Sequence, residues 1–146
     1  MSALSDRPNI LYIHSHDSGR YVQPYGYSVP TPNMQLLADQ GTLFRRAFCA
    51  APTCSGSRAA LLTGQHCHNN GMTGLAHRGW ELNDYGQHLV HPLKKAGYRT
   101  ILVGEQHISK DPGVIGYDEV RRLDSNLAGL VAPSALDAMS NAQEPF

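Results

Sequence analysis

Residues 52–64, with the sequence Pro-Thr-Cys-Ser-Gly-Ser-Arg-Ala-Ala-Leu-Leu-Thr-Gly, constrain the fold and the chemistry more than any other segment. Cys54 lies in a Ser/Gly turn, and the apolar run that follows predicts a helix that ends at Gly64. This layout places Cys54 just before a helix N-terminus, where free backbone N–H groups and the helix dipole favour an anion. Arg58, one helical turn later, adds a forked and permanently charged donor group. The segment therefore predicts a site that holds an anionic group against Cys54.

The same residues also suit an ordinary helix start. Ser55 or Ser57 is a typical N-cap residue, because a hydroxyl can accept a hydrogen bond from a free backbone N–H of the first turn. Many cysteines of folded proteins are buried and carry no chemical role. The spacing alone leaves the functional and the structural interpretation of Cys54 open.

The segments on either side predict strands that alternate with helices. Short apolar, β-rich runs predict strands at 9–14, 42–48 and 99–104, the first and last of them buried. Capping residues around apolar positions predict helices at 32–40, at 87–96 and from 133 or 134 to 142. This order favours an α/β fold, with a mainly parallel sheet flanked by helices. Residues 143–146 are expected to enter another strand, so the domain is expected to be incomplete.

Polar residues follow both predicted buried strands. His16 and Asp17 come after the first strand, and Glu105 and His107 come after the second. In open α/β sheets the ligands bind at the carboxyl ends of the strands. These four side chains are therefore candidates for a common site.

Composition excludes several classes of function. The chain has 146 residues, and its 12 basic residues balance its 12 acidic residues, so no basic excess indicates a nucleic-acid or membrane partner. Three irregularly spaced cysteines do not form a disulfide framework. No apolar run reaches the roughly 20 residues of a membrane span, and residues 1–7 lack the apolar core of a signal peptide. The expected location is the cytoplasm.

Three separated motifs carry a family resemblance. The first is the segment 7–13 followed by His-Asp-Ser-Gly at 16–19, the second is Cys-Ser-Gly-Ser-Arg at 54–58, and the third is 97–107, which ends in Gly-Glu-Gln-His. Together they resemble the sulfatase family of the alkaline-phosphatase-like superfamily. The stretch His-Asn-Asn-Gly-Met at 68–72 is similar to the heparan N-sulfatase (sulfamidase) branch.

The resemblance implies a fold and an activity. Residues 1–7 would be an N-terminal tail, and 8–146 would be the N-terminal part of a sulfatase domain, truncated on its C-terminal side. The implied enzyme is a sulfuric ester or sulfamate hydrolase. The 146-residue chain alone is expected to be inactive, because the family's second set of metal ligands would lie beyond it. A phosphate or phosphonate ester hydrolase of the same superfamily, and a catalytically inactive anion-binding protein, are the alternatives.

The resemblance also implies roles for individual residues. Cys54 would be oxidised to formylglycine, whose hydrate attacks sulfur and contacts a divalent metal. Arg58 would stabilise the anion, and His107 would transfer a proton or contact the sulfate. Asp17 would bind the metal, with His16 as a further ligand. The implied metal is calcium, or manganese or another transition metal because of His16.

Three residues depart from the family pattern. His16 stands where the family has its first aspartate, Gly56 where it has proline or alanine, and Glu105 where it has lysine. A carboxylate at 105 would repel a sulfate unless it is paired, so Glu105 is expected to contact the metal or a cationic group of the substrate. His77 is a further candidate for substrate contact. The implied partners are a small sulfated substrate, such as a sulfated sugar, and the maturation enzyme that generates formylglycine.

Overall fold

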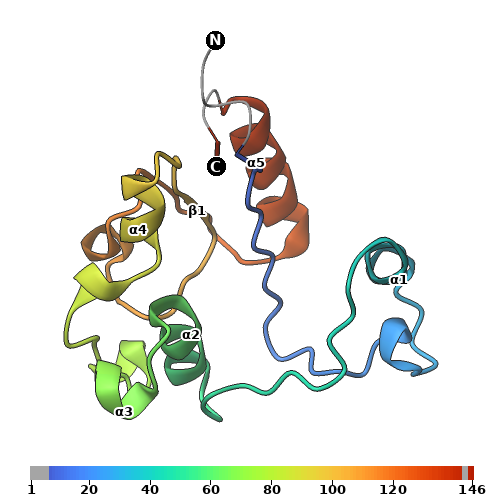
Figure 1. Ribbon diagram of the computed structural model, residues 1–146, viewed down its shortest axis with the longest axis horizontal. Helices are drawn as coiled ribbons and strands as arrows, with labels where there is room; N and C mark the ends of the chain where they lie inside the picture. Colours follow the sequence, from blue (N-terminus) through green and yellow to red (C-terminus); the bar gives the residue numbers. More distant parts are fainter. Residues whose placement is uncertain (1–6, 143–144) are drawn as a thin grey trace. The chain divides into compact units, whose positions relative to one another are not determined.

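The computed structural model of the protein describes residues 7–142 and 145–146 (Figure 1). The chain forms two compact units. Unit 1 combines the N-terminal segment through Leu11 with Cys49–Phe146, and unit 2 consists of Tyr12–Phe48. Among the described residues, every helix is too short or too polar to serve as a membrane span.

Within the described residues, the sheet of unit 1 has two parallel strands, β1 (Ile101–Val103) and β2 (Glu119–Arg121). Leu102 pairs with Val120 at the centre of the register. Parallel strands need a crossover connection, and here the connection contains the short 3-10 helix η4 (Pro112–Ile115). The parallel pairing agrees with the sheet type that the sequence predicts.

Strand β1 lies inside the predicted strand at 99–104. Its three residues are half-buried, whereas the sequence predicts a buried strand. The physical reason is that β1 has a single strand neighbour among the described residues, while helix α5 (Ala128–Ser140) packs against it. The apolar side chains of β1 are therefore covered only in part.

Helix α2 (Cys54–Thr63) forms as its sequence predicts and ends at Gly64. Gly64 adopts a left-handed conformation with φ 68°, and its N–H donates to the carbonyl of Ala60 at 2.9 Å. Glycine takes this conformation at little steric cost, so it ends the helix cleanly. The short helix α3 (Cys67–Asn70) follows directly.

The predicted helix at 87–96 is divided into two pieces. The 3-10 helix η3 (Tyr85–Gln87) comes first, and helix α4 (Val90–Lys95) follows after a break. Pro92 lies in the first turn of α4, where its missing N–H costs no intrahelical hydrogen bond.

Helix α5 begins earlier than the sequence predicts. It spans Ala128–Ser140, whereas the sequence predicts a helix from Pro133 or Ser134 to Ala142, and Pro133 lies inside it. The prediction took the proline as a helix start. The apolar residues before Pro133 extend the helix by several residues towards its N-terminus, and residues 128–133 form its first turns.

The hydrophobic core of unit 1 joins α2 to the loop that follows β1. Ala59 of α2 and Ile108 of that loop are both fully buried. Burial of one large apolar side chain contributes about 1.5–3 kcal/mol, so this core fixes the two segments against each other. The buried core residues are Ala59, Met72, Leu82, Val90, Ile108 and Ile115, with Leu62, Tyr85 and Tyr117 packed against them.

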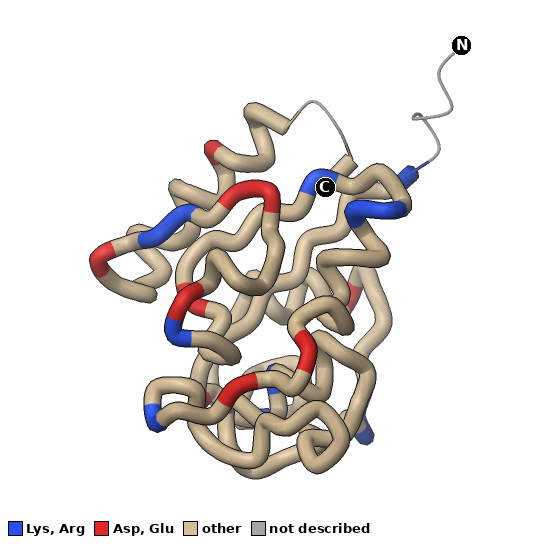
Figure 2. The backbone as a smooth tube through the Cα atoms, turned by 90° about the vertical axis from the view of Figure 1, so that its left-hand side faces the viewer, with Lys and Arg blue, Asp and Glu red and all other residues tan. Residues whose placement is uncertain are grey.

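Both signs of charge occur along the described backbone (Figure 2), and unit 1 pairs several of them. Arg99 and Arg121 both contact the carboxylate of Glu119 in β2. The hydrogen bond from Arg121 lowers the pKa of Glu119. Lys94 of α4 lies 2.7 Å from the carboxylate of Asp118.

Unit 2 contains the 3-10 helix η1 (Gln23–Tyr25) and helix α1 (Pro32–Gln40). As the sequence predicts, Thr31 is the N-cap of α1 and Gly41 ends it. The Thr31 hydroxyl accepts a hydrogen bond from the backbone N–H of Gln23 at 3.0 Å, so it ties the two helices together.

The predicted buried strand at 9–14 is wrong. These residues are not assigned to a strand, and the side chains of Ile10, Leu11 and Ile13 are 49%, 54% and 75% exposed. Ile10 donates its N–H to the carbonyl of Phe146. A buried strand needs a ladder of hydrogen bonds and cover on both faces, and the described residues do not provide that cover.

The short strand predicted at 42–48 is also wrong. The structure assigns no strand to these residues, and Phe44 and Phe48 are 70% and 90% exposed. A β-rich composition favours a strand only where a neighbouring strand and a packed face are present. Within unit 2, Tyr25 donates its hydroxyl to the carbonyl of Phe44 at 3.1 Å.

The strand entry expected at 143–146 falls in part on 143–144, which lie outside the described residues. The two residues that follow connect separate segments of unit 1. Arg99 donates its N–H to the carbonyl of Pro145 at 2.8 Å, and the N–H of Phe146 donates to the side chain of Asn9. The structure assigns no strand to Pro145 or Phe146.

Candidate functional site

Cys54 is the first residue of α2 rather than the residue before it. The N-cap is Thr53, in an extended conformation, and its carbonyl accepts the first helical hydrogen bond from Ser57 N–H at 2.9 Å. Neither serine that the sequence offered as a cap takes that role. The half-buried Cys54 thus lies in the first turn, where free N–H groups and the helix dipole favour negative charge.

Ser55 has a structural role of its own. It is fully buried, donates its hydroxyl to the carbonyl of His107 at 2.6 Å, and accepts the N–H of Ala76 at 3.1 Å. One hydroxyl therefore fastens two loops to the first turn of α2. Sequence reasoning missed this role, because no local pattern indicates hydrogen bonds to residues 21 and 52 positions away.

Gly56 packs closely against its surroundings. A Cβ at this position would lie 3.0 Å from the carbonyl oxygen of Met72 and 3.2 Å from the Ala51 Cβ. The proline or alanine that the family resemblance expects here would require these neighbours to move by a few tenths of an ångström. Glycine therefore lets the first turn of α2 approach Met72 closely.

His107 follows β1 in a backbone conformation that few residues adopt. Its φ is +55°, in the left-handed region, where residues other than glycine are uncommon. The buried side chain of Gln106 holds this turn by accepting the N–H of Ser109 at 3.0 Å and donating to its carbonyl at 2.7 Å. Residues held in such conformations are often found at functional sites.

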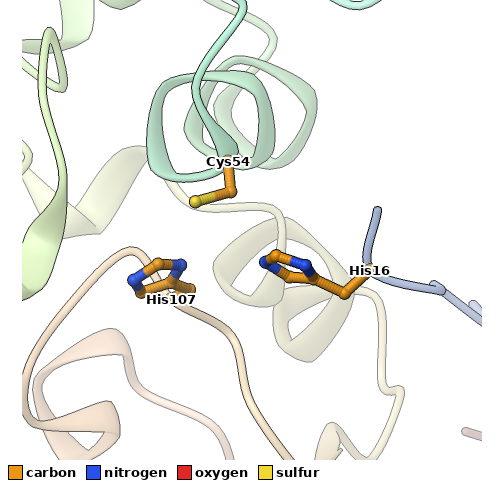
Figure 3. Close-up of side chains that lie close together, drawn as sticks. All are labelled: His16, Cys54 and His107. Atoms are coloured by element: carbon orange, nitrogen blue, oxygen red, sulfur yellow. The ribbon is translucent and has the colours of Figure 1, made fainter. Parts of the chain in front are cut away.

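Cys54 and His107 come together in unit 1. The Cys54 sulfur lies within 4.8 Å of a ring nitrogen of His107, and Figure 3 shows the thiol projecting from α2 above the imidazole. The two residues are 53 positions apart and share an anchor in Ser55. The fold thus places an imidazole beside the predicted nucleophile.

Arg58 lies one turn after Cys54, on the same face of α2, because residues four apart are neighbours on a helix surface. Its Nη1 donates to the carbonyl of Glu105 at 2.9 Å. Its Nε is buried and has no hydrogen-bond partner among the described residues. The guanidinium therefore has donor capacity left for an anion near Cys54.

Glu105 is exposed, and its carboxylate is held by Asn126. The Asn126 side chain donates to Glu105 Oε2 at 2.7 Å. The contact between Glu105 and Arg58 runs through the Glu105 backbone carbonyl and not through the carboxylate. The carboxylate is thus paired with an amide and not with a cation.

His77 comes from the 3-10 helix η2 (Ala76–Arg78) and lies beside His107. Its Nδ1 is 3.0 Å from Nε2 of His107, and the two ring planes are nearly parallel, at 4°. His77 is exposed, whereas His107 is half-buried. The structure therefore brings His77 to the same cluster as Cys54 and His107.

His16 and Asp17 belong to unit 2 and form a local pair there. His16 Nδ1 lies 3.0 Å from Asp17 Oδ2, and the two side chains are 50% and 88% exposed. Asp17 has a φ of +54°, which aspartate tolerates better than most residues. The pair occupies the polar turn that the sequence predicts as a metal-binding corner.

Comparison with known proteins agrees with these features. The Sulfatase family model matches residues 8–145, so the chain belongs to the sulfatase family. It is 37% identical over 106 residues to human N-sulphoglucosamine sulphohydrolase, covering 70% of this chain and 21% of that protein. It is 32% identical over 127 residues to an arylsulfatase of Klebsiella aerogenes, covering 80% and 27%. Human N-acetylgalactosamine-6-sulfatase is 38% identical over 120 residues, covering 72% and 22%.

The chain spans about a quarter of the length of these relatives. Family membership fixes the fold family, an alkaline-phosphatase-like sulfatase domain with helices and a small parallel sheet. It agrees with the resemblance that the three motifs carry.

Proposed function

We propose that this chain supplies the nucleophile end of the active site of a sulfuric ester or sulfamate hydrolase. One observation carries the proposal: Cys54 lies in the first turn of α2, within 4.8 Å of a His107 ring nitrogen and one turn before Arg58, in a chain of the sulfatase family. This arrangement combines a nucleophile precursor, a proton-transfer group and a fixed cation.

In this proposal the maturation enzyme oxidises Cys54 to formylglycine with molecular oxygen as the oxidant, the thiol sulfur leaves as sulfide, and the hydrate of the resulting aldehyde is the nucleophile. Its oxygen forms a bond to sulfur while the bond from sulfur to the leaving oxygen, or to nitrogen in a sulfamate, breaks. Loss of a proton from the remaining hydroxyl then expels sulfate and restores the aldehyde. His107, beside Cys54, takes part in these proton transfers, and Arg58 offsets the negative charge.

The donor set in unit 2 fits a divalent cation. Asp17 offers a carboxylate oxygen, and His16, whose Nδ1 faces that carboxylate, has Nε2 left for a metal. An imidazole oriented by a carboxylate is a common arrangement at metal sites. We propose that Asp17, His16 and modified Cys54 hold the ion, with calcium favoured by the family and manganese or another transition metal by His16. Such an ion, when bound, polarises a sulfate oxygen and the hydrate.

We propose a sulfated sugar as the substrate class. Two of the relatives are named for amino sugars, as N-sulphoglucosamine sulphohydrolase and N-acetylgalactosamine-6-sulfatase. Glu105, which stands where the family has lysine, offers a carboxylate, held by Asn126, for a cationic group of the substrate or for the metal. The cytoplasmic location and the maturation enzyme stay predictions from the sequence.

Two alternative functions, both predicted from the sequence, are also compatible with the site. A phosphate or phosphonate ester has the same tetrahedral shape as a sulfate ester, so the anion site formed by Cys54 and Arg58 suits both. An inactive anion-binding protein is the second alternative. We further propose that residues 8–146 are one part of a larger domain and that the isolated chain hydrolyses aryl sulfates poorly.

The first test is mass spectrometry of the peptide that contains Cys54, after expression in a host that matures sulfatases. The mass decrease of a thiol-to-aldehyde conversion is expected at Cys54 and not at Cys67, which also lies at the start of a short helix. An unmodified Cys54 thiol would exclude the formylglycine mechanism. The full-length protein is then assayed on paired nitrophenyl sulfate and phosphonate substrates, and faster phosphonate hydrolysis would favour the alternative ester.

A further inference from the structure

The turn that follows β1 holds His107 in a backbone conformation that a histidine does not favour by itself. Among the described residues other than glycine, only Asp17 and His107 have a positive φ, and the φ of His107 is +55°. This conformation is costly for a residue with a Cβ, so it persists only where the surrounding contacts outweigh the cost. The contacts that hold the backbone of His107 therefore decide where its side chain lies.

The side chain of Gln106 supplies three of these contacts. Its Oε1 accepts the backbone N–H of Ile108 and that of Ser109, and its Nε2 donates to the carbonyl of Ser109 at 2.7 Å. One amide group thus spans His107 and bonds the two residues that follow it. Gln106 is 7% exposed and Ile108 is fully buried, so water does not readily replace these hydrogen bonds.

Two side chains from other elements hold the same turn at its carbonyl groups. The hydroxyl of Ser55 in α2 donates to the carbonyl of His107 at 2.6 Å, and the hydroxyl of Tyr85 in η3 donates to the carbonyl of Ile108 at 3.0 Å. Each of these two residues bonds one carbonyl of the turn from outside. Gln106 alone bonds N–H groups and a carbonyl together, so it fixes the shape of the turn itself.

The shape of this turn determines the direction of the His107 side chain. A change of φ from +55° to the usual negative region is a rotation about the N–Cα bond, and it redirects the Cβ relative to the preceding chain. The imidazole, which lies beside the Cys54 sulfur (Figure 3), would move with the Cβ. The position of the imidazole next to Cys54 thus depends on the positive φ.

We propose that Gln106 is a positioning residue of the Cys54–His107 cluster: its amide holds His107 in the left-handed conformation and so keeps the imidazole beside Cys54. This inference rests on the proposed function, because it assigns Gln106 to the same reaction. Gln106 contacts no reacting atom in this proposal and acts through the backbone of His107.

The first measurement does not depend on activity. A positive φ brings the amide hydrogen and the Hα of one residue unusually close, so His107 is expected to give a strong NOE cross-peak between them in the 146-residue chain. His88, with a φ of −70°, is the internal reference and is expected to give a weak one. Gln106→Met, which has a similar length but no hydrogen-bonding group, is expected to weaken the His107 cross-peak to the level of His88.

Gln106→Glu is the conservative variant for the same measurement. Burial and the facing carbonyl of Ser109 favour the neutral form of a carboxyl group, whose hydroxyl can donate as Nε2 of Gln106 does. Its other oxygen can accept the same two N–H groups. Gln106→Glu is therefore expected to keep the strong cross-peak of His107.

The second measurement is steady-state kinetics of the matured full-length protein. Gln106→Met is expected to lower kcat about 10- to 100-fold with little change in KM, because a small displacement of a reacting group is costly to the chemical step. Gln106→Glu is expected to recover most of kcat. The control is Val90→Ala, at a buried core residue of α4 that has no hydrogen bond to this turn; it lowers the unfolding free energy but is expected to keep kcat near wild type.

The outcomes separate this inference from the proposed function. A weak His107 cross-peak in the wild-type chain, or a strong one in Gln106→Met, overturns the role of Gln106 whatever the activity. A loss of kcat in Gln106→Met no larger than in Val90→Ala also overturns it, because lost stability would then explain the effect. If Gln106→Met does not fold, Gln106→Glu decides: a weak cross-peak there overturns the role, and a strong one with near-normal kcat supports it. An unmodified Cys54 with the expected cross-peaks contradicts the proposed reaction and leaves the positioning of His107 by Gln106 supported.

Discussion

The two clusters of candidate site residues are held in different ways. In unit 1, Cys54 and His107 are tied together by the buried hydroxyl of Ser55 and by an apolar core that includes Ile108. In unit 2, His16 and Asp17 contact each other from exposed positions on one turn. The first cluster is built by long-range packing, and the second by neighbours in the sequence.

This difference indicates that the fold preorganises the Cys54–His107 cluster more strongly than the His16–Asp17 pair. Hydrogen bonds inside a buried network are costly to break, because each lost partner leaves a polar group without water. An exposed pair between neighbours costs little to rearrange. The nucleophile and its imidazole are therefore positioned by the fold, whereas a ligand such as a metal can still order the His16–Asp17 pair.

The largest effect is expected from Cys54. Cys54→Ala removes the only precursor of the proposed nucleophile, so turnover of the matured full-length protein should fall on the order of 10⁴-fold or more. Steady-state kinetics on a nitrophenyl sulfate measures it. Cys67→Ala is the control and should keep wild-type activity, and residual activity near wild type in Cys54→Ala would refute the nucleophile.

The second prediction concerns acid and the buried part of unit 1. Burial, and then the charge of His91, lower the pKa of His88 from 6.5 to about 4. The unfolded chain therefore binds a proton between pH 6.5 and 4 that the folded chain does not, and stability falls as the pH drops through this window. His88 is 1% exposed, so the loss should reach about 3 kcal/mol at pH 4.

Urea unfolding at a series of pH values measures this loss. His88→Asn is the comparison, because its amide can keep the hydrogen bond that Val90 N–H donates to Nδ1 of His88 without gaining a charge. The variant is less stable overall but should lose the part of the pH dependence due to His88. An equal slope in both chains would show that His88 does not titrate as described.

The third prediction tests the anchor of the first cluster. Ser55→Ala leaves the carbonyl of His107 and the N–H of Ala76 without their buried partner, which should cost about 2–3 kcal/mol of unfolding free energy. Denaturant unfolding measures the change. Ser57→Ala, two residues further on in the same turn, should change stability by less than about 1 kcal/mol. If both substitutions lower the unfolding free energy equally, the hydroxyl of Ser55 is not the special anchor described above.

The smallest effect is expected in unit 2. His16→Ala removes one partner of an exposed pair, so the unfolding free energy should change by less than about 0.5 kcal/mol. The same variant should weaken binding of manganese, measured by calorimetry on the full-length protein, relative to His14→Ala. A large loss of stability in His16→Ala would mean that unit 2 is as tightly built as unit 1.

Local signals predicted the helices well and the strands less well. Helix α1 begins at Pro32, after the N-cap Thr31, as the sequence predicts. Helices α1 and α2 end at the predicted glycines, Gly41 and Gly64. The strand at 9–14 failed because burial depends on neighbours that a local pattern does not contain. Strand β2 was missed because its sequence, Glu-Val-Arg, has a single apolar residue and is stabilised by ion pairs to Arg99 and within the strand.

In the candidate site, too, local sequence predicts some features, while others depend on tertiary contacts. The spacing of Cys54 and Arg58 on one helix predicts a shared face, and the position of His107 after a strand predicts its place at a sheet edge. The hydrogen bonds of Ser55 and the pairing of His77 with His107 join residues 21 to 52 positions apart. Such contacts are set by the tertiary fold, so no periodicity or motif reports them.

The buried hydroxyl of Ser55 also makes the site a reporter of folding. The amide proton of Ala76 is donated to this oxygen in the interior of unit 1, so it cannot exchange with water while the two loops stay on α2. Its exchange rate would then follow the opening of the whole unit rather than local fraying. The exchange rate of this single amide, far from Cys54 in the sequence, would thus report whether the loops that carry His77 and His107 are packed on α2.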